Sequence, residues 1–98
     1  MKSTVVRYRT KADRADENQR LVEAVFEDLR AHAPQVFDYQ VQRLDDGVSF
    51  VHLAIQSEDG PTPLAKLDAF QRFQQDVRDR CDEPPAVTDL SLIGSYRL

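Results

Sequence analysis

His52 is the residue whose chemistry best suits a functional site in this sequence. An imidazole with an ordinary pKa near neutrality can act as a general base or orient a ligand. The alternative is a structural histidine, hydrogen-bonded at a subunit interface to Gln40 or to a backbone carbonyl. The sequence leaves both interpretations open, with His52 as the candidate catalytic residue.

Two arginines at alternate positions, Arg7 and Arg9, could bind an anionic ligand, because guanidinium groups pair well with carboxylates and phenolates. The alternative is salt bridging to Asp38 or Asp89 along a sheet. If the arginines share a face with the histidine, the predicted ligand-binding residues around His52 are Arg7, Arg9, Gln40 and Phe50.

Other kinds of site lack the necessary motifs. Two distant histidines and one cysteine do not have the spacing of a zinc site. The sequence has neither a glycine-rich phosphate loop nor a nucleophile elbow. We therefore expect no metal and no cofactor.

Four strands and two helices are needed to position these residues. Strands are predicted over residues 3 to 10, 36 to 44, 48 to 56 and 87 to 97 from β-branched and aromatic content and from alternation. One helix is predicted between Asp13 and Ala33, and a second from Pro63 to Val77 with Thr62 as its cap. The order β-α-β-β-α-β favours a ferredoxin-like α+β fold, with both helices on one face of a four-stranded antiparallel sheet. Its first and third strands should be central.

The turn Asp45-Asp46-Gly47 decides which side chains share a face. A three-residue loop, with Gly47 in the left-handed conformation, would pair Leu44 with Val48. The pairs Val41–Val51, Tyr39–Leu53 and Phe37–Ile55 would then lie under the helices, and a two-residue loop would instead pair Val41 with His52. Since burial specifies register, the three-residue loop is predicted.

With this register, the helices would also cover Val6, Tyr8, Leu90 and Leu92. The opposite face would mix the polar candidates with the apolar side chains Val5, Val48, Phe50 and Ile93. Apolar patches of this kind usually mark an interface, and two-fold dimers are the commonest oligomers. The sequence therefore predicts a homodimer.

Length and composition limit the possible functions. The 98 residues predict a single domain, 1–98, and the net charge of −4, with no basic stripe, argues against nucleic acid as a partner. No apolar run approaches the roughly 20 residues of a membrane span. One cysteine and no signal-peptide pattern favour a cytoplasmic location.

The whole chain resembles the dimeric α/β-barrel superfamily, and within it the small antibiotic-biosynthesis-monooxygenase-like proteins. The residues that carry the resemblance are Asn18, Leu21, Val25-Phe26, Leu29, Pro34, Tyr39, Asp46-Gly47, Phe50-Val51-His52-Leu53, Ala69-Phe70, Phe73, Pro84-Pro85 and Gly94-Ser95-Tyr96. The resemblance implies a dimer whose two sheets pack face to face. It also implies oxidation of polycyclic aromatic substrates without metal or flavin, or haem degradation. The absence of tryptophan departs from the haem-degrading pattern.

Three functions follow as alternatives. The first is a cofactor-independent monooxygenase for a small aromatic or quinol, with His52 as base and Phe50 in the apolar wall. The second is a non-catalytic, small-ligand-binding or stress-related dimeric barrel. The third is a structural subunit that uses its free edge strands. A pocket too small or too salt-bridged for a bicyclic ligand would favour the second.

Overall fold

The computed structural model describes residues 2–32, 37–56 and 62–97. The elements follow the predicted order, with short 3-10 turns, η1 and η2, before the two helices. Their bounds are β1 (Lys2–Thr10), η1 (Ala12–Arg14), α1 (Ala15–His32), β2 (Phe37–Arg43), β3 (Ser49–Gln56), η2 (Pro63–Lys66), α2 (Asp68–Gln75) and β4 (Cys81–Leu90).

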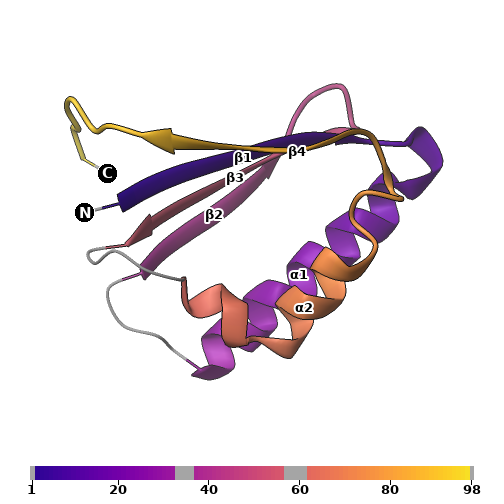
Figure 1. Cartoon of the computed structure of the whole chain (residues 1–98), viewed down its shortest axis with the longest axis horizontal. Coiled ribbons are helices and arrows are strands. Elements are labelled where there is room, and N and C mark those ends of the chain that lie inside the picture. Colours follow the sequence, from indigo (N-terminus) through magenta and orange to yellow (C-terminus); the bar gives the residue numbers. More distant parts are fainter. Residues whose placement is uncertain (1, 33–36, 57–61, 98) are drawn as a thin grey trace.

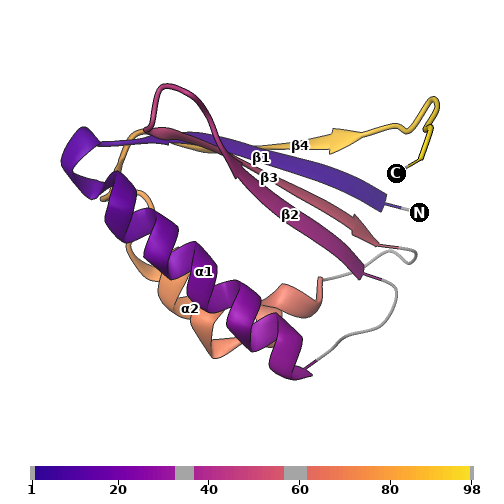
Figure 2. The ribbon, with the colours of Figure 1, turned by 180° about the vertical axis from the view of Figure 1, so that it is seen from behind.

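The four strands form one antiparallel sheet in the order β2-β3-β1-β4, with β1 and β3 central as predicted. Both helices lie side by side on the same face of the sheet (Figures 1 and 2). Sheet and helices are closest where β1 turns into α1, and they diverge toward the end that carries both termini (Figure 1). The ferredoxin-like fold is thus confirmed. The face without helices is called the open face below.

Apolar residues at three- and four-residue spacing are buried in α1, namely Val22, Val25 and Leu29, but the second predicted helix is divided. Leu67 is extended, with φ −87° and ψ 130°, between η2 and α2. Thr62 makes no capping hydrogen bond with its side chain. Instead, the Asp28 carboxylate of α1 accepts the backbone N–H of Ala69 at 3.2 Å. A contact between the helices therefore satisfies a donor at the start of α2, which local sequence signals could not reveal.

The last strand lies earlier in the chain than predicted. β4 spans Cys81–Leu90 and includes Pro84 and Pro85, whereas residues 91–97 are exposed and not in a strand. Proline lacks the N–H that a central strand needs, but an edge strand pairs on one side only. β4 pairs with β1 alone, and its register shifts between Arg7 and Arg9, beside the prolines. The strand predicted over 87–97 is confirmed for residues 87–90 only, and the prediction that Leu90 and Leu92 lie under the helices was wrong, since both are exposed.

The β2–β3 register differs by one residue from the predicted register. Val41 pairs with His52, and Tyr39 pairs with Ala54. The Leu44 N–H donates to the carbonyl of Ser49 at 2.9 Å, so four residues separate these two. A four-residue loop has the same parity as a two-residue loop. Every side chain of β3 therefore lies on the opposite face from that predicted.

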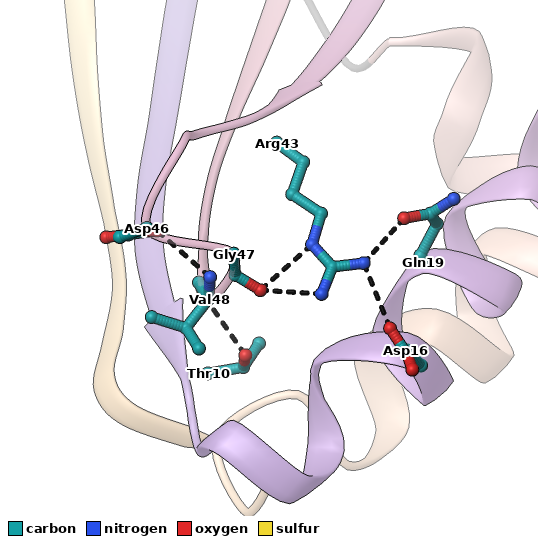
Figure 3. A network of polar contacts seen from close by, with 7 residues as sticks. All are labelled: Thr10, Asp16, Gln19, Arg43, Asp46, Gly47 and Val48. Atoms are coloured by element: carbon teal, nitrogen blue, oxygen red, sulfur yellow. Dashed lines mark hydrogen bonds and ion pairs between the residues drawn. The ribbon is translucent and has the colours of Figure 1, made fainter.

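Polar contacts explain why the longer loop is stable (Figure 3). The Asp46 carboxylate accepts the N–H groups of Val48 and Ser49 at 2.9 and 2.8 Å and the Ser49 hydroxyl at 2.6 Å. The hydroxyl, followed by the two N–H groups, lowers the pKa of Asp46. Arg43 donates to the carbonyl of Gly47 at 2.6 and 2.9 Å, and also to Asp16 and Gln19 of α1. Gly47 has φ +76°, the left-handed conformation that was predicted.

The observed register confirms part of the predicted core and contradicts the rest. Phe37, Tyr39 and Val41 of β2 pack against the buried core, as predicted. On β3 the buried residues are Ser49, Phe50, His52 and Gln56. The apolar residues Val51, Leu53 and Ile55 lie on the open face, half-buried. The apolar residues of β3 predicted the wrong face to be buried, because the face under the helices carries polar residues in place of some apolar ones.

Candidate functional site

The predicted constellation of site residues is divided between the two faces of the sheet. His52 and Phe50 are buried under the helices, 6% and 1% exposed. Arg7, Arg9 and Gln40 are exposed on the open face. The physical cause is the even number of residues in the hairpin loop. It places each β3 side chain on the opposite face from that predicted, whereas the faces of β1 and β2 are as predicted. The prediction that these five residues share one face was wrong.

The open-face candidates make ordinary surface contacts. Arg9 forms an ion pair with Glu83 at 3.2 Å, and both side chains are about half exposed or more. The Gln40 side chain accepts a hydrogen bond from Gln42 at 2.9 Å. Neither contact involves His52, so the alternative in which Gln40 holds this histidine is also wrong.

Two tyrosine hydroxyl groups hold the His52 ring. Its Nε2 lies 2.7 Å from the Tyr8 hydroxyl, and its Nδ1 lies 2.6 Å from the Tyr39 hydroxyl. The three residues come from the adjacent strands β1, β2 and β3, and the register places them on one face. Both ring nitrogens are therefore occupied, and a ligand would meet the imidazole beside these hydroxyl groups.

A buried amide and a buried guanidinium extend this network. Asn18 of α1 donates to the Tyr8 hydroxyl at 2.9 Å, and Arg80 donates to the Asn18 side-chain oxygen at 3.1 Å. Arg80 also donates to the Phe73 carbonyl at 2.8 Å, and its guanidinium carbon lies 5.2 Å from the centre of the Phe73 ring. Asn18 and Arg80 are 0% and 1% exposed. We call the five residues Arg80, Asn18, Tyr8, His52 and Tyr39 the polar chain.

Sequence reasoning missed most of the polar chain. The tyrosines resembled ordinary core aromatics, and Arg80 lies in a run of charged residues that looks like a solvated surface. Tyr8 and Tyr39 become neighbours of His52 only in the correct register, since each lies two residues from a cross-strand partner of His52. The apolar alternation of β3 favours the odd loop, so no local pattern in the sequence marked these partners.

Burial keeps the aromatic members of the polar chain neutral. It lowers the pKa of His52 to about 4, because the charged imidazolium is costly away from water. Burial also raises the pKa of both Tyr8 and Tyr39 well above their usual value, and the Asn18 hydrogen bond offsets part of the rise at Tyr8. At neutral pH the site therefore presents a neutral imidazole and two neutral hydroxyl groups.

A pocket of about 480 Å³ opens beside this network, between the sheet and the second helical segment. Tyr8, Tyr39 and His52 line its sheet side. Its apolar wall includes Leu64, Phe70, Phe73, Val77 and Val87. A largely apolar cavity of several hundred cubic ångströms with a few polar groups is the usual form of a small-molecule site. The volume is sufficient for a bicyclic ligand.

Acidification is expected to destabilise the protein through His52. The unfolded chain binds the imidazole proton with a pKa near 6.5, whereas the folded protein binds it near 4. The contribution of the neutral histidine is therefore complete above pH 6.5 and is lost as the pH falls to 4, by about 3 kcal/mol. Urea unfolding across this range should show a smaller loss in His52→Gln than in wild type. His32→Gln, at an exposed histidine, is the control, and equal pH dependence in all three proteins would contradict the prediction.

Other chemical features are sparse in the described ranges. Residues 2–32, 37–56 and 62–97 contain no group of three or more His, Cys, Asp and Glu side chains that could hold a metal ion. Within the same ranges, neither helix has the length and apolar character needed to cross a membrane.

The chain was compared with protein families, curated proteins and solved structures. No family model matches it, and no curated protein matches it. A proposed antibiotic biosynthesis monooxygenase from Nitrosomonas europaea superposes with a TM-score of 0.75 at 14% identity, covering 94% of this chain and 89% of that one. An antibiotic biosynthesis monooxygenase superposes with a TM-score of 0.71 at 14% identity, covering 96% and 100%.

A dimeric ferredoxin-like protein of unknown function from Jannaschia sp. CCS1 also superposes, with a TM-score of 0.60 at 14% identity, covering 93% of this chain and 98% of that one. At such identities the likeness concerns the fold. It confirms the structural resemblance expected from the sequence. The chain therefore has the ferredoxin-like fold of the antibiotic-biosynthesis-monooxygenase-like proteins.

Proposed function

We propose that this protein binds a small aromatic ligand in the pocket between sheet and helices and oxidises it without a cofactor. The main observation in support is a neutral imidazole, held between two tyrosine hydroxyl groups at the wall of a largely apolar pocket of about 480 Å³. Aromatic side chains suit a planar ligand, and the hydroxyl groups can bind its oxygen atoms. The fold shared with a protein described as an antibiotic biosynthesis monooxygenase supports the proposed oxidation.

A quinol is a suitable substrate because it can supply every electron that oxygen requires. One oxygen atom of O₂ forms a bond to a ring carbon in place of hydrogen, and the other leaves as water. A 1,4-quinol thereby becomes a hydroxyquinone, and its four lost electrons reduce O₂ completely. In this proposal Tyr39 contacts the quinol oxygen, His52 orients the Tyr39 hydroxyl, and Phe70 and Phe73 exclude water.

Oxygen uptake with 1,4-naphthoquinol tests this function. The wild-type protein should consume oxygen faster than the protein-free autoxidation of the quinol. Tyr39→Phe and His52→Ala should each lower the protein-dependent rate by more than about tenfold, a loss of 1.4 kcal/mol in transition-state stabilisation. Gln40→Ala, on the open face, is the matched control and should retain the rate. Uptake no faster than autoxidation would remove the enzymatic proposal.

One observation favours ligand binding without catalysis as a second function. Both nitrogens of His52 are occupied by tyrosines, and its pKa near 4 makes it a weak base. A binding protein needs only the pocket and a hydrogen-bonding group. Calorimetric binding of 1,4-naphthoquinone, together with no oxygen uptake above the background, would support this second function.

We also propose that the protein is a homodimer joined through the open face. Of the apolar residues expected there, Val5 lies on this face, whereas Phe50 does not. Val51, Leu53 and Ile55 join Val5 on the central strands. A depression of about 240 Å³ lies among these side chains, lined partly by Val5, Val51 and Leu53. Such a patch suits a second copy of the chain, and the solved neighbour described as dimeric supports a dimer.

A further inference from the structure

The direction of hydrogen bonding along the polar chain starts at Arg80. A guanidinium group only donates hydrogen bonds. The Asn18 atom that faces Arg80 at 3.1 Å must therefore be the side-chain oxygen. This contact assigns the orientation of the Asn18 side-chain amide. The Asn18 nitrogen consequently faces Tyr8 and donates to the hydroxyl oxygen at 2.9 Å.

The hydrogen bond from Tyr8 to His52 runs in the same direction, with the Tyr8 hydroxyl as donor. Its oxygen accepts from Asn18, so its own proton needs an acceptor. Within the described part of the chain, the Nε2 atom of His52, at 2.7 Å, is the acceptor in contact with this hydroxyl. Tyr8 is only 2% exposed, and leaving its proton unpaired would cost about 1–3 kcal/mol. The His52 Nε2 atom is therefore the unprotonated nitrogen of the ring.

The polar chain ends at the Tyr39 hydroxyl, whose proton is left for an acceptor outside the five residues. A neutral imidazole with a bare Nε2 carries its proton on Nδ1. This N–H donates to the Tyr39 oxygen, 2.6 Å away. The Tyr39 hydroxyl then keeps its own proton for another acceptor, and Tyr39 lines the pocket.

We infer that Arg80 and Asn18 orient the polar chain so that Tyr39 donates a hydrogen bond to the ligand and selects a ligand with an acceptor oxygen. The matching groups are a quinone carbonyl, a phenolate or a carboxylate on an aromatic ring. The selection of a ligand in this inference rests on the proposed function, whereas the direction of the hydrogen bonds along the polar chain does not. Arg80, Asn18, Tyr8 and His52 are positioning residues, and Tyr39 is the contact residue.

Asn18→Asp should reverse the direction of every hydrogen bond along the polar chain from Tyr8 to Tyr39. A carboxylate only accepts hydrogen bonds, so both Arg80 and Tyr8 would have to donate to it. The Tyr8 oxygen would then accept from a protonated Nε2, and Nδ1 would become the acceptor of the Tyr39 proton. The Tyr39 oxygen would be left to accept from the ligand. Asparagine and aspartate have the same shape, and Arg80 supplies the countercharge that a buried carboxylate needs.

The tautomer of His52 is measured by ¹⁵N NMR of the full-length protein labelled at histidine. The chain has two histidines, and His32→Gln assigns the signals. In wild type, Nδ1 should carry the proton and Nε2 should not, and Asn18→Asp should exchange them. If Asn18→Asp does not fold, Tyr39→Phe provides the test, because it should keep the wild-type tautomer. A wild-type proton on Nε2, or a tautomer that changes in Tyr39→Phe, would overturn the inferred direction.

Ligand selection is measured by calorimetry with two bicyclic probes, 1-indanone and indole. The ketone only accepts hydrogen bonds, and the indole N–H only donates one. Wild type should bind 1-indanone at least about fivefold more tightly, close to 1 kcal/mol for one neutral hydrogen bond. Asn18→Asp should reverse this preference, and Tyr39→Phe should abolish it. Binding of neither probe would overturn ligand selection and count against the proposed pocket, whereas equal binding of both would overturn ligand selection alone.

Discussion

Phe50→Asp is expected to unfold the protein. Phe50 is 1% exposed, and its ring stacks on Tyr8 with centroids 5.5 Å apart. Removing a buried phenylalanine ring alone costs about 3–5 kcal/mol, and the aspartate would add an unpaired charge in the core. Since small domains are stable by only about 5–15 kcal/mol, little folded protein should remain. Circular dichroism and the dispersion of a proton–nitrogen NMR spectrum measure this loss.

Leu53→Asp is the matched substitution on the other face. Leu53 is half-buried on the open face, opposite Val5 of β1 and Gln40 of β2. This variant should stay folded and should dissociate the proposed dimer, because it places charges in an apolar interface. Sedimentation equilibrium should then give the 11.2 kDa protomer instead of twice that mass. A folded Phe50→Asp together with an unfolded Leu53→Asp would contradict the Val41–His52 register.

Asn18→Leu is expected to destabilise the fold by about 3 kcal/mol or more. The substitution removes the acceptor of Arg80 and the donor to Tyr8, both of them buried. A buried charged group that loses its partner pays most of its desolvation cost. Urea denaturation measures the change. Arg20→Met, at an exposed position on the same helix, should stay within about 0.5 kcal/mol of wild type.

Combining Asn18→Leu with Arg80→Met should recover part of this loss. Replacing both polar partners by apolar side chains leaves fewer unpaired groups than replacing one. The double variant should be more stable than the sum of the single effects by about 1–3 kcal/mol. Additive effects would show that Arg80 and Asn18 do not depend on each other, and would count against the polar chain.

The element order and the sheet order could be predicted from the sequence because both follow from strong local patterns. Apolar spacing located the first helix, and alternation in β2 placed Tyr39 and Val41 correctly. The side chains of β3 could not be placed in the same way. Their faces depend on whether the hairpin loop has an odd or an even number of residues, and Asp46 stabilises the longer loop by contacts that simple turn rules do not include.

The site shows the same limit in another form. His52 stood out by its residue type, but its partners depend on long-range contacts between residues far apart in the chain. Arg80 and Asn18 are separated by 62 positions, and Arg80 resembles its exposed neighbours in the sequence. Burial of a polar residue is favourable only when the fold supplies its partners. Hydrophobic patterning alone could therefore not place His52 under the helices.

An NMR titration with 1-indanone tests most directly whether the ligand site lies between the sheet and the helices. The ¹⁵N signals of the His52 ring and the backbone amide of Phe73 should shift and saturate together as the ketone is added. The side-chain amides of Gln40 and Gln42, which lie on the open face, should not move. Shifts at Gln40 and Gln42 with unchanged His52 signals would contradict a site between the sheet and the helices and place the ligand on the open face.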